Sequence, residues 1–276
     1  MAHAHESPRA ATEAPHAAEF RFYEELNDFL PEAQRKRAFT HVFGGTPTVK
    51  DVIESLGVPH TEIDLILVDG DSVRFSHKLR GGERVAVYPV FERLDIRPLC
   101  RLRPRPLRRA RFVADVHLGA LTRRLRLLGF DTLYGRDWDD AHLAAVSARE
   151  ARILLTRDIG LLKYKSVMRG HWVRGTDPRR QLEEVLRAFS LGRDLQPFTR
   201  CTVCNGRLRL VARAAVFGRV PPRVYARFRR FVRCIRCKRI YWRGSHYNRL
   251  QALTRSLRQA MRSGRQPAGA GQRASG

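Results

Sequence analysis

Aspartates stand where two apolar runs end and where a later helix would begin. Asp115 follows the run FVA, Asp158 ends the stretch ILLTRD, and three more acids lie at positions 137, 139 and 140. Carboxylates gathered at one place repel one another unless a cation or a proton joins them. Oxygen-only ligation suits Mg²⁺ or Mn²⁺, ions that activate phosphodiesters for hydrolysis. The sequence therefore predicts a catalytic Mg²⁺ or Mn²⁺ site at these acids.

Each of these acids also has a simpler interpretation. A single Asp after a strand commonly forms a turn or caps a helix, and Asp139 or Asp140 could cap the helix that follows. Convergence of several acids at one edge of a sheet is what favours the metal site.

Four of the five cysteines form two Cys-x-x-Cys pairs. Each pair can present two thiolates from one tight turn, and two such turns complete a tetrahedral Zn²⁺ shell. We expect Zn²⁺ to be structural here, because four protein ligands leave no open position for catalysis. A redox dithiol would need only one pair, and Cys100 has no visible partner. The predicted zinc ligands are Cys201, Cys204, Cys234 and Cys237.

Strands and helices alternate through residues 111–190. RFVAD, DTLYG, RILLT and HWV have the composition of short strands, and LGALTRRLRLLG, DDAHLAAVSAREA and PRRQLEEVLRAF have helical periodicity. Asp177 and Pro178 suit the start of the last helix. This order predicts a parallel sheet with helices on its faces, and ligands of such sheets collect beyond the carboxyl ends of the strands.

The earlier segment has a different pattern. The strand-like stretches FRFYEEL and AFTHVF are followed by TVKDVIESLGVP, which reads as a helix capped by Thr48, and then by DLILV and RVAVYPV. Asp69-Gly70 signals a turn. Two strands, a helix and two further strands suit a small β-grasp domain, in which Gly81-Gly82 forms a turn.

Composition suggests the domain boundaries. We expect a disordered tail at 1–18, the β-grasp domain at 19–95, an Arg- and Pro-rich linker at 96–110, the α/β domain at 111–195, the zinc ribbon at 196–250 and a basic disordered tail at 251–276. The fold class expected is therefore α+β followed by α/β, with a zinc ribbon at the end.

Lys and Arg number 53 against 27 acids, for a net charge of +26. Such a charge attracts polyanions, and nucleic acid is the commonest of them. The alternative is an Arg-rich proteome without a specific partner. We expect no membrane association and no secretory signal, and paired cysteines in a reducing compartment indicate a cytoplasmic protein.

The quoted segments resemble known families. TVKDVIESLGVP, ILVDG and GGERVAVYPVF are similar to ubiquitin-like and sulfur-carrier-like β-grasp proteins. Those carriers act through a free C-terminal Gly-Gly, whereas this chain continues through FERLDIRP after the last strand. RFVADVHLGALTRRLRLLGFDTLYG and DDAHLAAVSAREARILLTRD, with the later Cys-x-x-Cys pairs, resemble the Mut7-C family, a PIN-like predicted ribonuclease module with a zinc ribbon.

That resemblance implies roles for individual residues. Asp115 and Asp158 fall at acidic positions of the PIN-like active site, Asp140 at a third, and Asp139 beside it. Arg157 would meet a phosphate or pair with a carboxylate. A fourth acid, frequent in PIN-type nucleases, has no clear position here.

Two functions follow. The first is a metal-dependent ribonuclease, with single-stranded or structured RNA as its partner. The second is a non-catalytic RNA-binding or adaptor protein, whose β-grasp domain recruits a protein partner. Arg side chains crowd residues 207–243 among Phe228, Phe231, Tyr241 and Trp242, and we expect them to contact phosphates while Phe231 and Tyr241 form the ribbon core.

Overall fold

The computed structural model of the chain describes residues 15–89, 102, 110–244, 255 and 259. The chain divides into two compact units, Met1–Pro106 and Leu107–Gly276. Cys100, His246, most of the expected linker and nearly all of the expected C-terminal tail lie outside the described residues.

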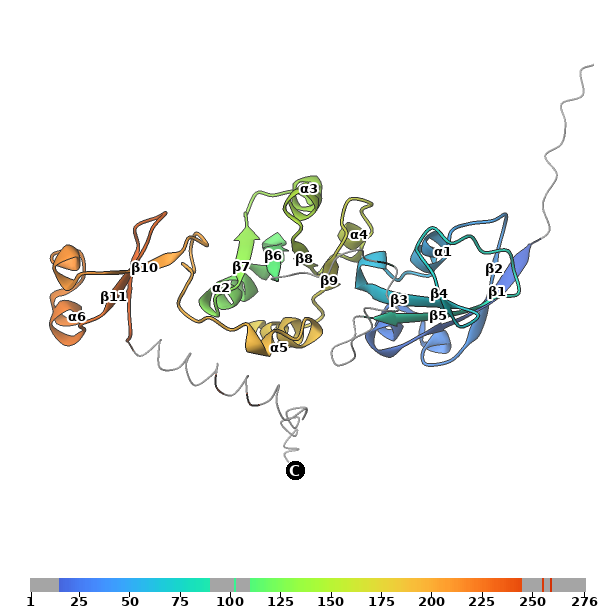
Figure 1. The fold of residues 1–276 in the computed structure, drawn as a ribbon, viewed down its shortest axis with the longest axis horizontal. Helices are drawn as coiled ribbons and strands as arrows, with labels where there is room; N and C mark the ends of the chain where they lie inside the picture. Colours follow the sequence, from blue (N-terminus) through green and yellow to red (C-terminus); the bar gives the residue numbers. More distant parts are fainter. Residues whose placement is uncertain (1–14, 90–101, 103–109, 245–254, 256–258, 260–276) are drawn as a thin grey trace, which may run out of the picture. The chain divides into compact units, whose positions relative to one another are not determined.

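The described part of the first unit contains a five-stranded mixed sheet and one α-helix (Figure 1). Strand order is β2-β1-β5-β3-β4, with a parallel central pair β1–β5 and antiparallel neighbours on both sides. This is the β-grasp arrangement predicted from the sequence. The strands are β1 His16–Phe22, β2 Phe39–Phe43, β3 Ile63–Val68, β4 Asp71–Ser72 and β5 Arg84–Pro89.

Helix α1, Val49–Ser55, begins where the sequence places it, because the Thr48 side chain accepts a hydrogen bond from the Asp51 N–H at 3.2 Å. Its buried face belongs to the same core as Phe20 and Phe22 of β1. Three 3-10 helices, Glu24–Phe29, Glu32–Gln34 and His60–Glu62, complete the connections.

The first strand begins earlier than the composition suggested. Residues 16–18, expected in a tail, belong to β1, and Ala18 is buried. Ala17 pairs with Val42 of β2. Small alanine side chains carry little hydrophobic signal in a sequence, but the edge strand β2 gives their backbone groups hydrogen-bond partners.

The second unit begins with a four-stranded, wholly parallel sheet in the order β7-β6-β8-β9. The strands are β6 Arg111–Ala114, β7 Asp131–Tyr134, β8 Ile153–Thr156 and β9 Gly170–Trp172. The helices are α2 Gly119–Leu127, α3 Asp140–Glu150, α4 Ile159–Leu162 and α5 Pro178–Ala188, with 3-10 helices at Val116–Leu118 and Leu191–Arg193.

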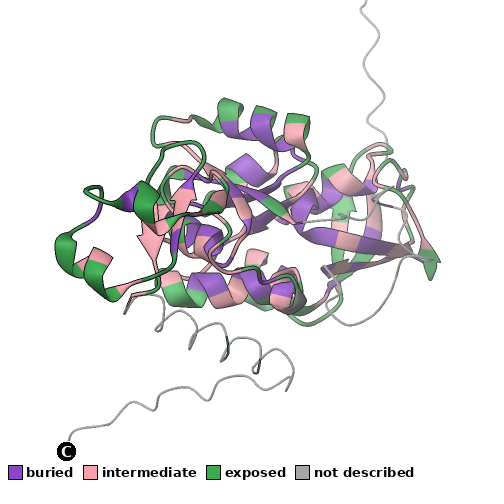
Figure 2. Cartoon of the chain, turned by 60° about the vertical axis from the view of Figure 1, so that its left-hand side comes forward, coloured by how far each residue is buried: buried purple, intermediate pink, exposed green. Residues whose placement is uncertain are grey.

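The helices cover both faces of this sheet (Figure 1). Phe112 and Leu155 pack with α2 and α5, whereas Val113 and Leu154 pack with α3 and α4. Successive strand residues point to opposite faces, so apolar runs such as ILL are buried on both sides. Figure 2 shows buried residues along the strands and on the inner faces of the helices, and exposed residues on the outer faces of the helices.

The unit ends in a small antiparallel ribbon with the order β10-β11-β12. These strands are Leu208–Val211, Phe231–Cys234 and Ile240–Trp242. The long segment between the cysteine pairs holds a 3-10 helix, Arg213–Val216, and helix α6, Pro222–Arg227. Val216, Val220 and Phe231 form a separate buried core there, and Phe228 and Trp242 pack against it.

Candidate active site and metal centre

The strand order places a topological switch point between β6 and β8, because the chain leaves β6 for β7 on one side and then crosses to β8 on the other. Ligands of open parallel sheets bind in the crevice at such a point. Asp115 follows the last residue of β6 directly, and Asp158 lies two residues after the end of β8. The two acids therefore lie on either side of that crevice.

Thr156 joins the two acids. Its buried hydroxyl donates to Asp115 Oδ2 at 2.9 Å and accepts from the backbone N–H of Asp158 at 2.9 Å. The Asp115 N–H in turn donates to the Leu155 carbonyl at 3.0 Å. The change from aliphatic residues to Thr-Arg-Asp at the end of β8 thus has a structural reason, because the hydroxyl fixes both acidic positions.

Asp139 and Asp140 share the start of α3 but differ in role. Asp139 caps the helix, since its Oδ1 accepts from the His142 N–H at 2.7 Å. Loss of hydration raises the pKa of Asp140, and the negative charges of Asp158, Asp115 and Asp139 raise this pKa further. The four acids named from the sequence therefore share one electrostatic environment.

The acidic cluster is looser than a closed metal site. Among the described residues, the four cysteines form the only group of three or more His, Cys, Asp or Glu side chains spaced to hold a metal ion. Asp115 is buried at its strand end, whereas Asp140 and Asp158 are exposed. An all-carboxylate donor set suits Mg²⁺ or Mn²⁺, and exposed side chains on both sides of the crevice can turn toward a shared ion.

Arg157 is exposed between Thr156 and Asp158. Its carbonyl accepts a hydrogen bond from Trp172 Nε1 at 3.3 Å. The guanidinium forms no ion pair with a carboxylate among the described residues, so the structure does not show the carboxylate pairing that the sequence left open.

Two acids near the end of β9 have structural roles. Asp177 caps α5 by accepting from the N–H groups of Arg179 and Arg180, both at 3.0 Å. Burial opposes ionisation of Glu184, but hydrogen bonds from His171 and from the Arg174 and Gly175 N–H groups lower its pKa. Asp177 and Glu184 therefore do not supply the fourth acid that is frequent in the PIN-type nucleases that the sequence resembles.

The four cysteine sulfurs lie within 4.8 Å of one another. Cys201 Sγ is 3.6 Å from Cys237 Sγ, and Cys204 Sγ is 3.4 Å from Cys234 Sγ. Four sulfurs at Zn–S bonds of about 2.3 Å in a tetrahedron would stand about 3.8 Å apart. The cluster therefore has the donors and the size for a tetrahedral metal ion.

The two cysteine turns have the same backbone geometry. The residue after each second cysteine adopts positive φ, 63° at Asn205 and 62° at Lys238. The Asn205 N–H donates to the Cys201 carbonyl and the Lys238 N–H to the Cys234 carbonyl. A Cβ on Gly206 would lie 2.8 Å from Cys234 Sγ, so glycine is needed where the turns meet.

Burial and neighbouring groups oppose ionisation at two positions of the cysteine cluster, Cys237 and Tyr241. Burial, together with hydrogen bonds to the other three thiols, raises the pKa of Cys237 to about 12. The Tyr241 hydroxyl lies 3.0 Å from Cys201 Sγ, and burial and this contact raise its pKa to about 12. A divalent cation would reverse the balance for the thiols, because metal binding releases their protons.

Sequence reasoning missed the contacts that hold the ribbon to the sheet. Arg126 of α2 is buried, and its Nη1 donates to the Thr202 and Val203 carbonyls of the first cysteine turn. Asp131, at the start of β7, binds Arg200 at 2.9 Å and Asn205 at 2.7 Å. Only pairing information between positions 69 or more residues apart could have revealed these contacts.

These contacts fix the ribbon's place on the sheet. The first cysteine turn lies against the amino end of β7, whereas the acids lie at the carboxyl ends of β6 and β8. The predicted metal centre therefore lies at the amino ends of the parallel strands, and the acidic cluster lies at their carboxyl ends.

The fold and the cysteine centre define a protein with a ubiquitin-like first unit and a parallel α/β second unit that ends in a four-cysteine ribbon. Among known families, the Mut7-C RNAse domain matches residues 110–254, and the Mut7-C ubiquitin domain matches residues 15–95. The chain therefore belongs to the Mut7-C RNAse domain family, as its motifs suggested.

Among solved structures, the chain resembles the crystal structure of H. volcanii small archaeal modifier protein 1, at 16% identity and a TM-score of 0.23. The match covers 28% of this chain and 99% of that one. A comparison with curated proteins found no match. Within the described part of the chain, every helix is too short or too polar to span a bilayer.

Proposed function

We propose that the second unit is a metal-dependent ribonuclease whose active site is the crevice between β6 and β8. The observation that carries this proposal is the placement of Asp115 and Asp158 on the two sides of the switch point, joined through Thr156. Membership of a family described as an RNase domain supports the class of reaction.

In this proposal Asp115, Asp140 and Asp158 hold Mg²⁺ or Mn²⁺, and Asp139 keeps α3 in place through its cap. The bound ion would supply Lewis-acid activation of the phosphodiester. Thr156 positions the Asp115 carboxylate, and the exposed Arg157 guanidinium binds a substrate phosphate bidentately.

The test is cleavage of a fluorescent single-stranded RNA by the full chain with added Mn²⁺ or Mg²⁺. Asp115→Asn and Asp158→Asn should each lower the rate by about 100-fold or more, since several kcal/mol of transition-state stabilisation are lost. Asp177→Asn is the matched control, because Asp177 caps α5 much as Asp158 caps α4 and asparagine also caps well. Equal activity in all three variants would refute the proposal.

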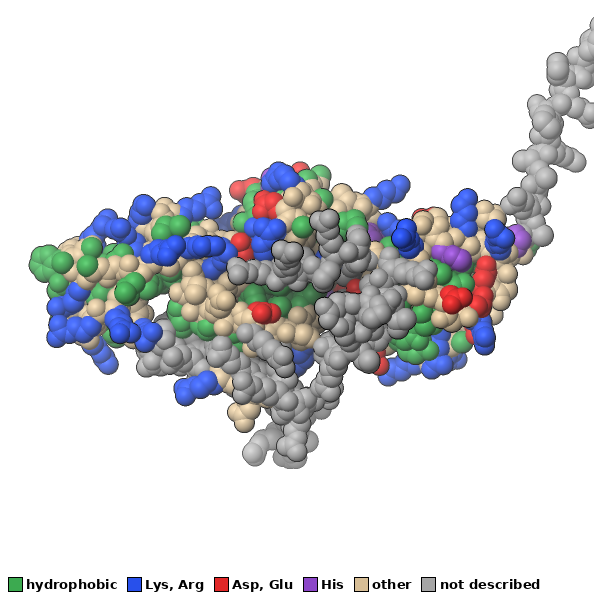
Figure 3. Space-filling model, in the orientation of Figure 1, with side chains coloured by type: hydrophobic (Ala, Val, Ile, Leu, Met, Phe, Trp, Pro, Cys, Tyr) green, Lys and Arg blue, Asp and Glu red, His purple; other side chains and the backbone are tan. Residues whose placement is uncertain are grey.

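A second candidate is a non-catalytic RNA-binding or adaptor protein, with a protein partner on the ubiquitin-like unit. It is favoured by the loose spacing of the acids and by the basic ribbon seen in Figure 3. RNA binding without added divalent ions, and no RNA product at any Mn²⁺ or Mg²⁺ concentration, would select it over the ribonuclease. We expect a cytoplasmic location for either function.

We further propose that the four-cysteine centre holds Zn²⁺ in a structural role. Four cysteine ligands and sulfur spacings near those of a tetrahedral shell support this metal. A shell of four protein sulfurs leaves no position for a reacting water.

A further inference from the structure

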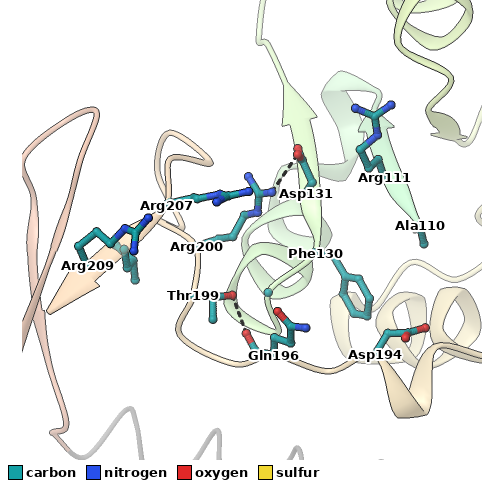
Figure 4. Close-up of a pocket in the computed structure, with 12 residues that line it drawn as sticks. Ala110, Arg111, Phe130, Asp131, Asp194, Gln196, Thr199, Arg200, Arg207 and Arg209 are labelled. Atoms are coloured by element: carbon teal, nitrogen blue, oxygen red, sulfur yellow. Dashed lines mark hydrogen bonds and ion pairs between the residues drawn. The ribbon is translucent and has the colours of Figure 1, made fainter. Parts of the chain in front are cut away.

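A cavity of about 560 Å³ lies where the ribbon joins the amino ends of the parallel strands. Its walls come from the start of β6, the turn before β7, the segment 194–200 and the start of β10. Figure 4 shows the side chains that matter for what it could bind, which are Arg111, Phe130, Asp131, Arg200, Arg207 and Arg209.

The cavity carries an excess of positive charge. Four arginines line it against two acids, Asp131 and Asp194. Asp131 is already shared between Arg152 and Arg200, each at 2.9 Å. Arg207 and Arg209 are exposed, and neither guanidinium forms an ion pair with a described carboxylate. These two exposed guanidinium groups are available to bind an anionic ligand from outside the protein.

The cavity and the acidic cluster lie at opposite ends of the same strand, β6. Arg111 begins β6 and lines the cavity, whereas Asp115 follows the last residue of the same strand. At about 3.3 Å per residue, the strand places these two positions about 13 Å apart. Helices cover both faces of β6, so an RNA strand must pass around the sheet over a longer path, which requires more than about four stacked nucleotides at about 3.4 Å each.

We propose that this cavity binds the phosphodiester backbone of a single-stranded RNA. The scissile bond of the same RNA would lie beside Asp115 and Asp158. This inference rests on the proposed ribonuclease function and adds a length requirement to it. Arg207 and Arg209 would contact phosphates through their guanidinium groups, whereas the Arg111 guanidinium donates to the Glu150 carbonyl. RNAs of about four nucleotides or fewer cannot occupy both sites.

The experiment measures binding of fluorescent 4-nucleotide and 16-nucleotide single-stranded RNAs to the full chain, without added Mg²⁺ or Mn²⁺, over a range of salt concentrations. The variant is Arg207→Gln with Arg209→Gln. The matched control is Arg37→Gln with Arg80→Gln, which removes the same charge from exposed positions of the ubiquitin-like unit, outside both the ribbon and the cavity. Zinc content and thermal unfolding confirm that each variant is folded.

The wild-type chain should bind the longer RNA much more tightly than the shorter one. The cavity variant should lose about tenfold in affinity for the 16-nucleotide RNA, and the slope of log K against log salt should become shallower by about 1.4 because two phosphate contacts are removed. The control variant should change by less than about twofold. Unchanged binding of the longer RNA by the cavity variant, or an equal loss in the control, would overturn the inference.

The binding experiment and the cleavage experiment test the two proposals independently. If the cavity variant loses binding but the wild-type chain cleaves nothing with Mn²⁺ or Mg²⁺, the ribonuclease proposal is wrong and the cavity remains an RNA-binding site. If the chain cleaves RNA and the cavity variant binds normally, the cavity assignment alone is wrong.

Discussion

At the scale of single residues, Thr156 has the most unusual position in the second unit. Its hydroxyl is buried at the end of β8 and serves Asp115 as donor and the Asp158 N–H as acceptor. A strand end needs no hydroxyl for its own stability. The presence of a hydroxyl at position 156 is therefore best explained by its hydrogen bonds to Asp115 and Asp158.

Replacing this hydroxyl tests that explanation. Thr156→Val keeps the shape but leaves an Asp115 oxygen and the Asp158 N–H without their partner, so we expect a loss of about 1–3 kcal/mol in unfolding free energy. RNA cleavage should fall by about tenfold or more, as for other groups that orient metal ligands. Thr156→Ser, which keeps the hydroxyl, should stay close to wild type. A Val variant with normal stability and activity would contradict this role.

Asp131 gives a prediction about pH. Burial opposes its ionisation, but hydrogen bonds from Asn205 and Arg152 and the charges of Arg152 and Arg200 lower its pKa below the ordinary 3.8. A carboxyl whose pKa is lower in the folded state stabilises the fold above its unfolded pKa, and this contribution disappears as pH falls through the folded pKa.

We therefore expect Asp131→Asn to lower the unfolding free energy by about 2 kcal/mol at pH 7. The difference from wild type should shrink steadily below about pH 4, as measured by urea unfolding at several pH values. Asp137→Asn, an exposed change of the same charge, should have an effect within about 0.5 kcal/mol. A difference for Asp131→Asn that does not vary with pH would show that its charge is not the cause.

At the scale of elements, most of the second unit could be predicted. The stripe of Leu118, Leu121, Leu125 and Leu128 identifies α2, and the Asp177-Pro178 pair marks the start of α5 where the structure has it. Apolar runs on both faces identify the parallel strands. These features depend on residues that are close together in the sequence, so the hydrophobic pattern alone can predict them.

Short and long-range features could not be predicted. Strand β4 has two residues and helix α4 has four, too few for any periodicity to appear. The segment between the cysteine pairs forms α6 and its own small core, although Arg interrupts its apolar residues throughout. The docking of the ribbon depends on Arg126 and Asp131 meeting residues far along the chain.

The turn between α2 and β7 depends on Gly129. Its φ is +98°, and a Cβ there would lie 2.2 Å from the Gln196 carbonyl oxygen. Gly218 also has positive φ, +70°, but its Cβ would meet nothing within 4 Å. Comparing alanine substitutions at these two glycines therefore separates the cost of backbone strain from the cost of steric overlap.

Gly218→Ala should cost about 1 kcal/mol, since only the left-handed conformation opposes it. Gly129→Ala should cost at least about 1 kcal/mol more, because the segment that joins the sheet to the ribbon must also move away. Thermal and urea unfolding of both variants would measure the difference. Equal losses would mean that residues 194–199 do not need their close approach to this turn.

At the scale of the whole molecule, the two units have separate cores of different size. The ubiquitin-like unit buries its own apolar cluster, whereas the ribbon has a small core beside four cysteines. A core of that size gives little stability without a metal ion.

We therefore expect about one Zn²⁺ per chain in the purified protein and much less in Cys234→Ser. Removal of zinc should unfold the ribbon and expose its tryptophan, Trp242, while the unfolding transition of the ubiquitin-like unit stays in place. Elemental analysis and near-UV circular dichroism measure the two effects. A ribbon that keeps its structure after complete loss of zinc would contradict the structural role of the metal.

The parallel sheet has a direction, and the second unit places different chemistry at its two ends. A nucleic acid held among arginines at the start of β6 and cut beside the acids at its end would be cut at a set spacing. The path between the two ends of the sheet would then set the fragment length, and the size of the fragments released would report it.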